Sequence, residues 1–171
     1  MKKLLLFALI LLLSALMISC TVVGNQPQQN EEETQQTDEA DKKAVTDTVE
    51  SFGKRLQSVS LLAPKDILEE SMKESYGNLV SQELIEKWIS DPLYAPGRLT
   101  SSPWPDRIEI LTVEKSSENE YEVKGEIIEV TSTEKTDGGV ASKRTITLTI
   151  KRFDDKWLIA NVILGDYVET K

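Results

Sequence analysis

Apolar residues are spaced in two different ways along this chain, and the change of spacing divides it into two parts. In the first part they recur every three or four residues, which places them on one face of a helix. The clearest case is the stripe formed by Val45, Val49, Phe52 and Leu56. This spacing predicts three amphipathic helices, over residues 45–56, 64–77 and 81–91.

The residues that flank these stripes support the predicted helix ends. Pro64 is suited to the first turn of the second helix, because its missing N–H is not needed there. Ser81 is a good N-cap for the third helix. Asp91 and Pro92 stop that helix, since the residue before a proline disfavours the helical conformation.

In the second part, apolar residues alternate with polar ones, as in strands with one buried face. Ile146, Leu148 and Ile150, for example, alternate with threonines. Four strands are predicted, over residues 107–115, 120–134, 140–153 and 156–165. Their connections are short and rich in turn-forming residues, so adjacent strands should pair antiparallel as a meander. Helices followed by such a meander predict an α+β domain.

Two of the predicted strands depart from simple alternation. In the second strand the parity of the apolar residues changes near Gly125, which indicates a bulge and a bend in the sheet. The last strand is apolar at both parities apart from Asn161. We therefore expect it to be central in the sheet and covered, at least in part, on both faces.

The stretch between the two parts, residues 89–110, contains four of the six prolines. Proline restricts the backbone, so ordering this crossing costs less conformational entropy than its length suggests. Two interpretations of its tryptophan stay open: the ring fills the interior, or it presents a rigid aromatic surface to a ligand. An arginine here could bind a ligand carboxylate or phosphate, although in an acidic chain it more often pairs with the protein's own acids. The candidate ligand-binding residues are Tyr94, Arg98, Trp104 and Arg107.

The first twenty residues have the features of an export signal. Lys2 and Lys3 precede an apolar run, residues 4–17, that is too short for an ordinary membrane-spanning helix. The only cysteine, Cys20, follows at the expected cleavage position, and the segment MISC that ends there resembles the lipobox of bacterial lipoproteins. This resemblance implies cleavage before Cys20, acylation of its thiol and anchoring at the extracytoplasmic face of the cell membrane. The alternative is an ordinary signal peptide beside a chance cysteine.

A change in composition marks the predicted start of the folded domain. Residues 21–41 are rich in Gln, Glu and Thr and have few large apolar side chains, so we expect an unstructured acidic tether. The predicted organisation is a signal peptide over residues 1–19, the lipidated cysteine and tether over residues 20–42, and one domain over residues 43–171.

The strand part resembles the nuclear transport factor 2-like superfamily. The resemblance is carried by EYEVKGEIIEVTSTE, residues 120–134, and SKRTITLTIKRFDDKWLIANVIL, residues 142–164. It implies a cone in which three N-terminal helices pack on a curved four-stranded antiparallel meander. It also implies a non-catalytic envelope role more often than an enzyme. The chain departs from the family pattern because no strand is predicted between the second and third helices.

The residues present limit the chemistry that this chain can perform. It has no histidine, which removes the usual general base and the usual zinc ligand. Lipidation of Cys20 would leave no thiol nucleophile. We therefore expect neither enzyme activity nor a metal or cofactor. The alternative is an enzyme that uses a carboxylate inside the cone, for which Asp166 and Tyr167 are the nearest candidates.

The net charge of −9 restricts the partners of the folded domain. Nucleic acids and anionic lipid surfaces both favour a basic patch, so neither is expected to bind it. The predicted function is that of a lipid-anchored binding or assembly domain whose partner is an envelope protein or peptide. A structural module that forms homodimers through its sheet face is a further alternative.

Overall fold

The computed structural model describes residues 26–169 of the 171-residue chain. The predicted export signal and Cys20 lie outside the described residues. The chain divides into two compact units, residues 1–37 and 38–171. In the first unit, the described residues 26–37 belong to helix α2 (Gln26–Arg55). None of the described helices is both long enough and apolar enough to span a membrane.

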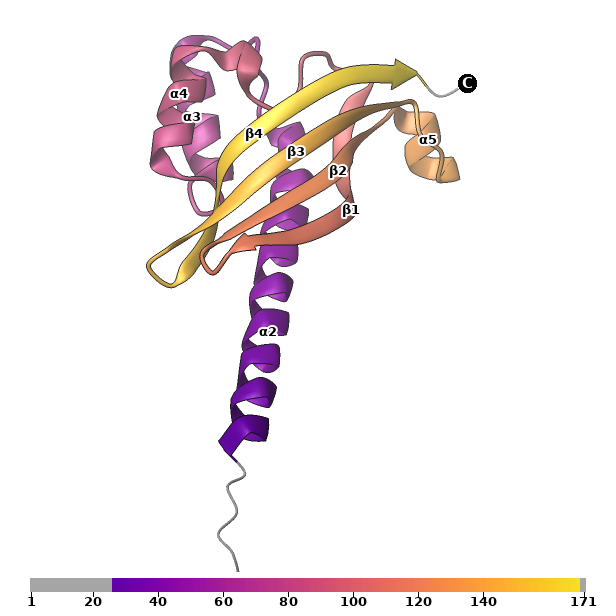
Figure 1. The fold of residues 1–171 in the computed structure, drawn as a ribbon. Helices are drawn as coiled ribbons and strands as arrows, with labels where there is room; N and C mark the ends of the chain where they lie inside the picture. Colours follow the sequence, from indigo (N-terminus) through magenta and orange to yellow (C-terminus); the bar gives the residue numbers. More distant parts are fainter. Residues whose placement is uncertain (1–25, 170–171) are drawn as a thin grey trace, which may run out of the picture. The chain divides into compact units, whose positions relative to one another are not determined.

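The second unit contains the rest of α2, followed by helices and then by strands, with one helix among the strands (Figure 1). This arrangement is the predicted α+β class. In chain order the further elements are η1 (Leu56–Ser58), α3 (Lys65–Tyr76), α4 (Gln82–Ser90), η2 (Pro92–Tyr94), β1 (Trp104–Ser117), β2 (Glu120–Val130), α5 (Ser132–Asp137), β3 (Ser142–Phe153) and β4 (Lys156–Glu169).

Helix α5 lies where the strand pattern predicts no helix. The second strand was expected to continue to residue 134, but β2 ends at Val130. The hydroxyl of Thr131 then accepts a hydrogen bond of 3.2 Å from the N–H of Thr133, and the carboxylate of Glu134 accepts one of 2.9 Å from the N–H of Thr131. Such a capping box starts a helix. Gly138, with a φ of 78°, ends it in the left-handed conformation.

The four strands form one antiparallel sheet in the order β1-β2-β3-β4, which confirms the predicted meander. The expectation that the last strand is central is wrong, because the first and last strands of a meander have only one neighbour each. β4 is therefore an edge strand (Figure 1). The side chain of Ile163 on this strand is 61% exposed.

The sheet is irregular at the predicted position. The register between β1 and β2 slips by one residue between Ile110 and Thr112, opposite Gly125. The extra residue, Leu111, thus lies on β1 and not on the strand that carries the glycine. A Cβ atom at position 125 would lie 2.7 Å from the main-chain oxygen of Glu109. Only glycine lets the two strands approach this closely.

The face of the sheet that packs against the helices, here called the inner face, forms the core with them. The predicted stripe of α2 is completely buried, and so is the predicted inward set of β3, whose side chains are at most 1% exposed. These residues are Val45, Val49, Phe52 and Leu56 of α2 and Ile146, Leu148 and Ile150 of β3.

Three aromatic rings join α2, α3 and α4. The ring centre of Phe52 lies 4.9 Å from that of Tyr76 and 6.2 Å from that of Trp88, and the latter two rings meet edge to face at 6.0 Å. The hydroxyl of Tyr76 donates a hydrogen bond of 2.9 Å to the carbonyl oxygen of Pro96. Burial raises the pKa of this phenol. This aromatic cluster therefore also fixes the proline-rich crossing.

The structure differs from the prediction in the described part of the predicted tether, residues 26–41. Residues 26–41 are helical, which agrees with the high helix propensity of the glutamines and glutamates among them. Asp41 is buried, where it accepts a hydrogen bond of 3.2 Å from Nε1 of Trp157 and pairs with Arg152. Asp38 pairs with Lys115 of β1. The folded unit therefore begins before the predicted boundary at residue 43.

We predict that Phe52→Ala lowers the free energy of unfolding by about 3–5 kcal/mol, because it removes a fully buried ring. Phe153→Ala is the matched control, since it makes the same change at a side chain that is 43% exposed, and its loss should be much smaller. Urea denaturation followed by circular dichroism measures both. Equal losses would contradict the central position of Phe52.

Candidate functional site

The four residues predicted to bind a ligand do not converge on one pocket. Tyr94 lies on η2 with its side chain 69% exposed, and it borders a groove beside β4. Arg98 lies in the proline-rich crossing, and Trp104 and Arg107 lie on β1. These three residues lie in different surroundings, which determine whether each side chain is available to a ligand.

Arg98 has a structural role through its main chain. Its N–H donates a hydrogen bond of 2.8 Å to the carbonyl oxygen of Val59, and its own carbonyl oxygen accepts one of 2.9 Å from the N–H of Leu61. These bonds fasten the proline-rich crossing to the segment that follows α2. A ligand contact by its guanidinium group stays a prediction.

Trp104 is the first residue of β1 and lies opposite Val130 of β2. Its side chain is half-buried and lies outside the core cluster. The interpretation that this ring fills the interior is therefore wrong. The tryptophans of the core are Trp88 of α4 and Trp157 of β4, which are 2% and 5% exposed.

The guanidinium group of Arg107 is neutralised by the protein's own carboxylates. It lies 2.5 Å from Glu109 and 3.1 Å from Asp106. The hydrogen bonds to Glu109 and Asp106 raise the pKa of Arg107. Asp106 also lies 2.5 Å from Lys135 of α5, so Asp106, Arg107 and Lys135, which border a pocket of about 300 Å³, all have ion-pair partners within the protein. This leaves Arg107 little capacity for a ligand.

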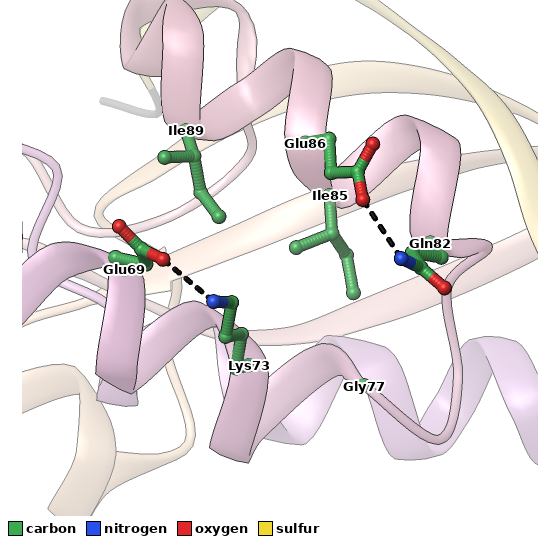
Figure 2. Close-up of a pocket in the computed structure, with 7 residues that line it drawn as sticks. All are labelled: Glu69, Lys73, Gly77, Gln82, Ile85, Glu86 and Ile89. Carbon is green, nitrogen blue, oxygen red and sulfur yellow. Dashed lines mark hydrogen bonds and ion pairs between the residues drawn. The ribbon is translucent and has the colours of Figure 1, made fainter.

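A second pocket, of about 510 Å³, lies between α3 and α4 (Figure 2). Its polar side chains bind one another along each helix: Lys73 lies 2.6 Å from Glu69, and Gln82 donates a hydrogen bond of 2.8 Å to Glu86. The hydrogen bond from Lys73 lowers the pKa of Glu69. Because these groups already have partners, the pocket offers a ligand few free polar contacts.

The third hollow is a groove of about 560 Å³ between α4, η2 and the end of the sheet formed by β3 and β4. We call it the α4–β4 groove. It combines buried apolar side chains, exposed apolar side chains and two basic groups. Its lining residues are Leu84, Lys87 and Trp88 of α4, Leu93 and Tyr94 of η2, Arg144 of β3, and Asn161, Val162, Ile163 and Leu164 of β4.

The groove begins where the segment that precedes α4, bonded to β4 at Ile159, turns away from that strand. The N–H of Ile159 donates to the carbonyl oxygen of Leu79, and the N–H of Ser81 donates to the carbonyl oxygen of Ile159, at 2.9 Å each. Ser81 then caps α4, as predicted, by accepting a hydrogen bond of 3.4 Å from the N–H of Leu84. Beyond Ile159, no main-chain hydrogen bond joins β4 to α4 or η2 within residues 26–169.

The rim of the groove exposes large apolar side chains. Leu93 and Tyr94 of η2 are 68% and 69% exposed, and Ile163 of β4 is 61% exposed. With Tyr167 and Val168, further along β4, they make five of the ten large apolar side chains that are exposed in the described part of the chain. Leu93, Tyr94 and Ile163, which line one groove, make it a candidate interaction site.

The charged side chains of the groove, Lys87 and Arg144, are both basic. Among the described residues, no carboxylate lies within 4.0 Å of either charged group. Nε of Arg144 donates a hydrogen bond of 2.8 Å to the carbonyl oxygen of Gly165, and its guanidinium carbon lies 4.7 Å from the ring centre of Tyr167. Two basic groups without an acidic partner, in so acidic a chain, favour an anionic ligand.

Sequence reasoning missed a buried acid at the same end of the sheet. Glu129 is 8% exposed, and its carboxylate accepts a hydrogen bond of 2.5 Å from the hydroxyl of Ser142. Burial, together with the nearby Glu129, raises the pKa of Tyr167. A signal was available, because Glu129 shares the parity of the inward residues Tyr121 and Ile127 in β2.

These acids do not form a site that would support the enzyme alternative. Asp166 is exposed, and Tyr167 packs against Arg144. Glu129 is enclosed by its own partners and does not line the α4–β4 groove. No group of three or more metal-ligating side chains occurs within the residues that the structure describes. The lack of catalytic activity stays a prediction.

No protein-family model and no curated protein matches the chain. Among solved structures it is similar to an NTF2-like protein of unknown function from Shewanella oneidensis MR-1, with 14% identity and a TM-score of 0.34, over 58% of this chain and 84% of that one. It is also similar to an NTF2-like protein involved in plasmid conjugation, with 12% identity and a TM-score of 0.40, over 73% of this chain and 49% of that one. The chain thus spans about half the length of the second protein. Because both TM-scores lie below 0.5, neither similarity assigns this chain a family, a function or a site residue.

Proposed function

We propose that the folded unit is a binding module that holds a segment of another envelope protein in the α4–β4 groove. We also propose that acyl chains on Cys20 hold this module at the extracytoplasmic face of the cell membrane. The observation that carries the first proposal is the groove itself, which joins apolar walls and an exposed apolar rim to two basic groups that have no carboxylate partner among the described residues. The second proposal rests on the basic start, the apolar run and the cysteine near the N-terminus.

The exposed rim favours a polypeptide over a small molecule. A small ligand inside the groove would leave much of the exposed surface of Leu93, Tyr94 and Ile163 in water, whereas a polypeptide segment that extends over the rim can cover it. Burying one large apolar side chain contributes about 1.5–3 kcal/mol. Covering these three side chains could therefore account for much of the affinity of a specific complex, even after the cost of ordering the segment.

The order of the elements supports a proposed place for the domain in the NTF2-like superfamily. Helices precede a four-stranded antiparallel meander, and the meander packs its inner face on α2. The departure expected from the sequence remains, since the segment between α3 and α4 makes only a single bridge, between Val80 and Ile159.

The alternative of a dimer formed through the sheet face has less support. The face of the sheet turned away from the helices carries ion pairs between β2 and β3, with Lys143 2.8 Å from Glu126 and Lys151 3.2 Å from Glu120. The threonines of β3 lie on the same face. The part of this face that β2 and β3 form is therefore stable in water and has little to gain from being covered.

The groove can be tested by photo-crosslinking in intact cells. A photoreactive residue at position 163, beside the groove, should give a discrete crosslinked product, and one at position 111 should not. Leu111 is the matched control, because it is 63% exposed on the opposite edge strand.

The double variant Leu93→Ser, Tyr94→Ser should reduce the yield of that product about tenfold or more, since it removes two of the apolar contacts of the rim. Leu62→Ser, at a side chain that is 70% exposed and outside the groove, should leave the yield unchanged. Equal crosslinking from positions 163 and 111, or a yield that ignores the rim variants, would reject the groove as the binding site.

The anchor can be tested separately. Cys20→Ala should move the protein from the membrane fraction to the medium or block processing of the precursor, because the acylated thiol is lost. Ser19→Ala is the control, since it keeps the cysteine and a small residue before it. Membrane retention and lipid labelling of the Cys20→Ala chain at the original level would exclude the proposed anchor.

A further inference from the structure

The chain already uses the outer edge of β4 for strand pairing at one point. Ile159 directs its N–H and its carbonyl oxygen away from β3, where they bond to Leu79 and Ser81. The bridge between Val80 and Ile159 is parallel, and the chain then turns away into α4. This edge of the sheet is therefore competent to receive an added strand.

The same edge continues without a partner beyond Ile159. Within an antiparallel sheet, residues two apart direct their main-chain groups to the same side. Ile159, Val162 and Leu164 of β4 lie opposite β3 residues that are two apart. The bulge between Ile159 and Asn161 adds one residue to β4, so Val162 and Leu164 keep the orientation of Ile159. The pairs are Ile159 with Ile150, Val162 with Leu148, and Leu164 with Ile146.

Val162 and Leu164 should thus direct their N–H and carbonyl groups outward, into the α4–β4 groove. Neither makes a main-chain hydrogen bond outside the sheet with any described residue. Buried main-chain groups need partners, so a segment that enters the groove and displaces water has to supply them.

The two edge strands differ in how they are protected. Natural sheets block their edges with charges, prolines and bulges. β1 has Pro105, charged residues and three register shifts against β2. β4 has two register shifts against β3, but residues 161–164, which lie between them and line the groove, carry neither charge nor proline. An unprotected apolar edge beside a groove is the geometry in which extended peptides are recognised.

The side chains of the groove specify the chemistry of the added segment. Trp88, Leu84 and the η2 residues offer apolar contacts, and Arg144 and Lys87 are the charged groups. Because neither cation has a carboxylate partner among the described residues, an acidic side chain on the segment would complement both.

We propose that the partner binds the α4–β4 groove as an added β-strand, paired with the outer edge of β4 at Val162 and Leu164. The bound segment is extended, has apolar residues at alternate positions and carries an Asp or Glu that meets Arg144 and Lys87. This inference rests on the proposed binding function and adds its geometry and the chemistry of the segment.

The test begins with a bead-bound library of random octapeptides, presented to the full chain in detergent micelles. Enriched peptides should carry an acidic residue among alternating apolar ones. Ile163→Asp should weaken their binding tenfold or more, because it places a charge at the edge. Arg144→Gln and Lys87→Gln should each weaken the binding of acidic peptides about threefold or more, because each removes one positive charge from the groove. Thermal melts establish that each variant is folded.

The decisive arm changes the peptide and leaves the protein unaltered. N-methylation at alternate amides removes the N–H groups on one side of an extended strand. Methylation of one alternating set of amides should weaken binding at least tenfold. Methylation of the other set should leave the affinity within about twofold of that of the unmethylated peptide. This periodicity of two is the signature of strand addition, and contact through side chains alone would not produce it.

Each other outcome has a distinct meaning. If enriched peptides require the rim residues but tolerate methylation at every amide, strand addition is wrong and the proposed binding function stands. If the unaltered chain enriches no peptide more than the Ile163→Asp chain does, both strand addition and the proposed binding function are wrong. If sedimentation shows that the chain is a dimer which Ile163→Asp converts to a monomer, the occupant is a second copy of this chain, and the proposed acidic partner is wrong.

Discussion

The burial of the apolar stripe of α2, and of Phe52 in particular, is the feature on which the rest of the folded unit depends. Tyr76 and Trp88 meet on the Phe52 ring, so α3 and α4 are positioned by the same contact. The hydroxyl of Tyr76 then holds Pro96, which fixes the crossing that follows η2. Trp88 belongs both to this cluster and to the wall of the α4–β4 groove. The groove is therefore shaped by the core and does not depend on an independent loop.

The distribution of charge gives the groove its character. Over most of the sheet, lysines and arginines are paired with nearby carboxylates, as Arg107 is with Glu109 and Lys143 is with Glu126. Exposed pairs of this kind contribute little to stability. Their main effect here is to neutralise the positive charges outside the groove. Lys87 and Arg144 differ from those cations because neither has a carboxylate partner among the described residues of this acidic molecule. A partner segment with a carboxylate would find these two cations beside an apolar groove and an open strand edge.

The spacing of apolar residues in the sequence correctly predicted which face of a helix or strand is buried. The stripe around Phe52 and the alternation around Leu148 are buried as expected, because each follows the period of its element. Tertiary contacts decided the rest. Asp41 becomes buried through Arg152 and Trp157, which lie far away in sequence. β4 is apolar at both parities, which is typical of a central strand, but it is an edge strand whose residues 161–164 line a groove. Of the predicted site residues, Tyr94 lines the groove, because Pro92 starts the short helix that carries it. Nothing in the sequence pattern singled out Lys87 and Arg144, which only the fold brings to the same groove.

The central claim is that the outer edge of β4 is covered at Ile159 and open beyond it, and amide hydrogen exchange tests this most directly. Residue-resolved exchange of the full chain should show the Ile159 amide protected by its bond to Leu79. The amides of Val162 and Leu164 should exchange at least about tenfold faster, because they have no partner within the described residues. Equal protection of all three amides would contradict an open edge and, with it, the site at which a partner strand could add.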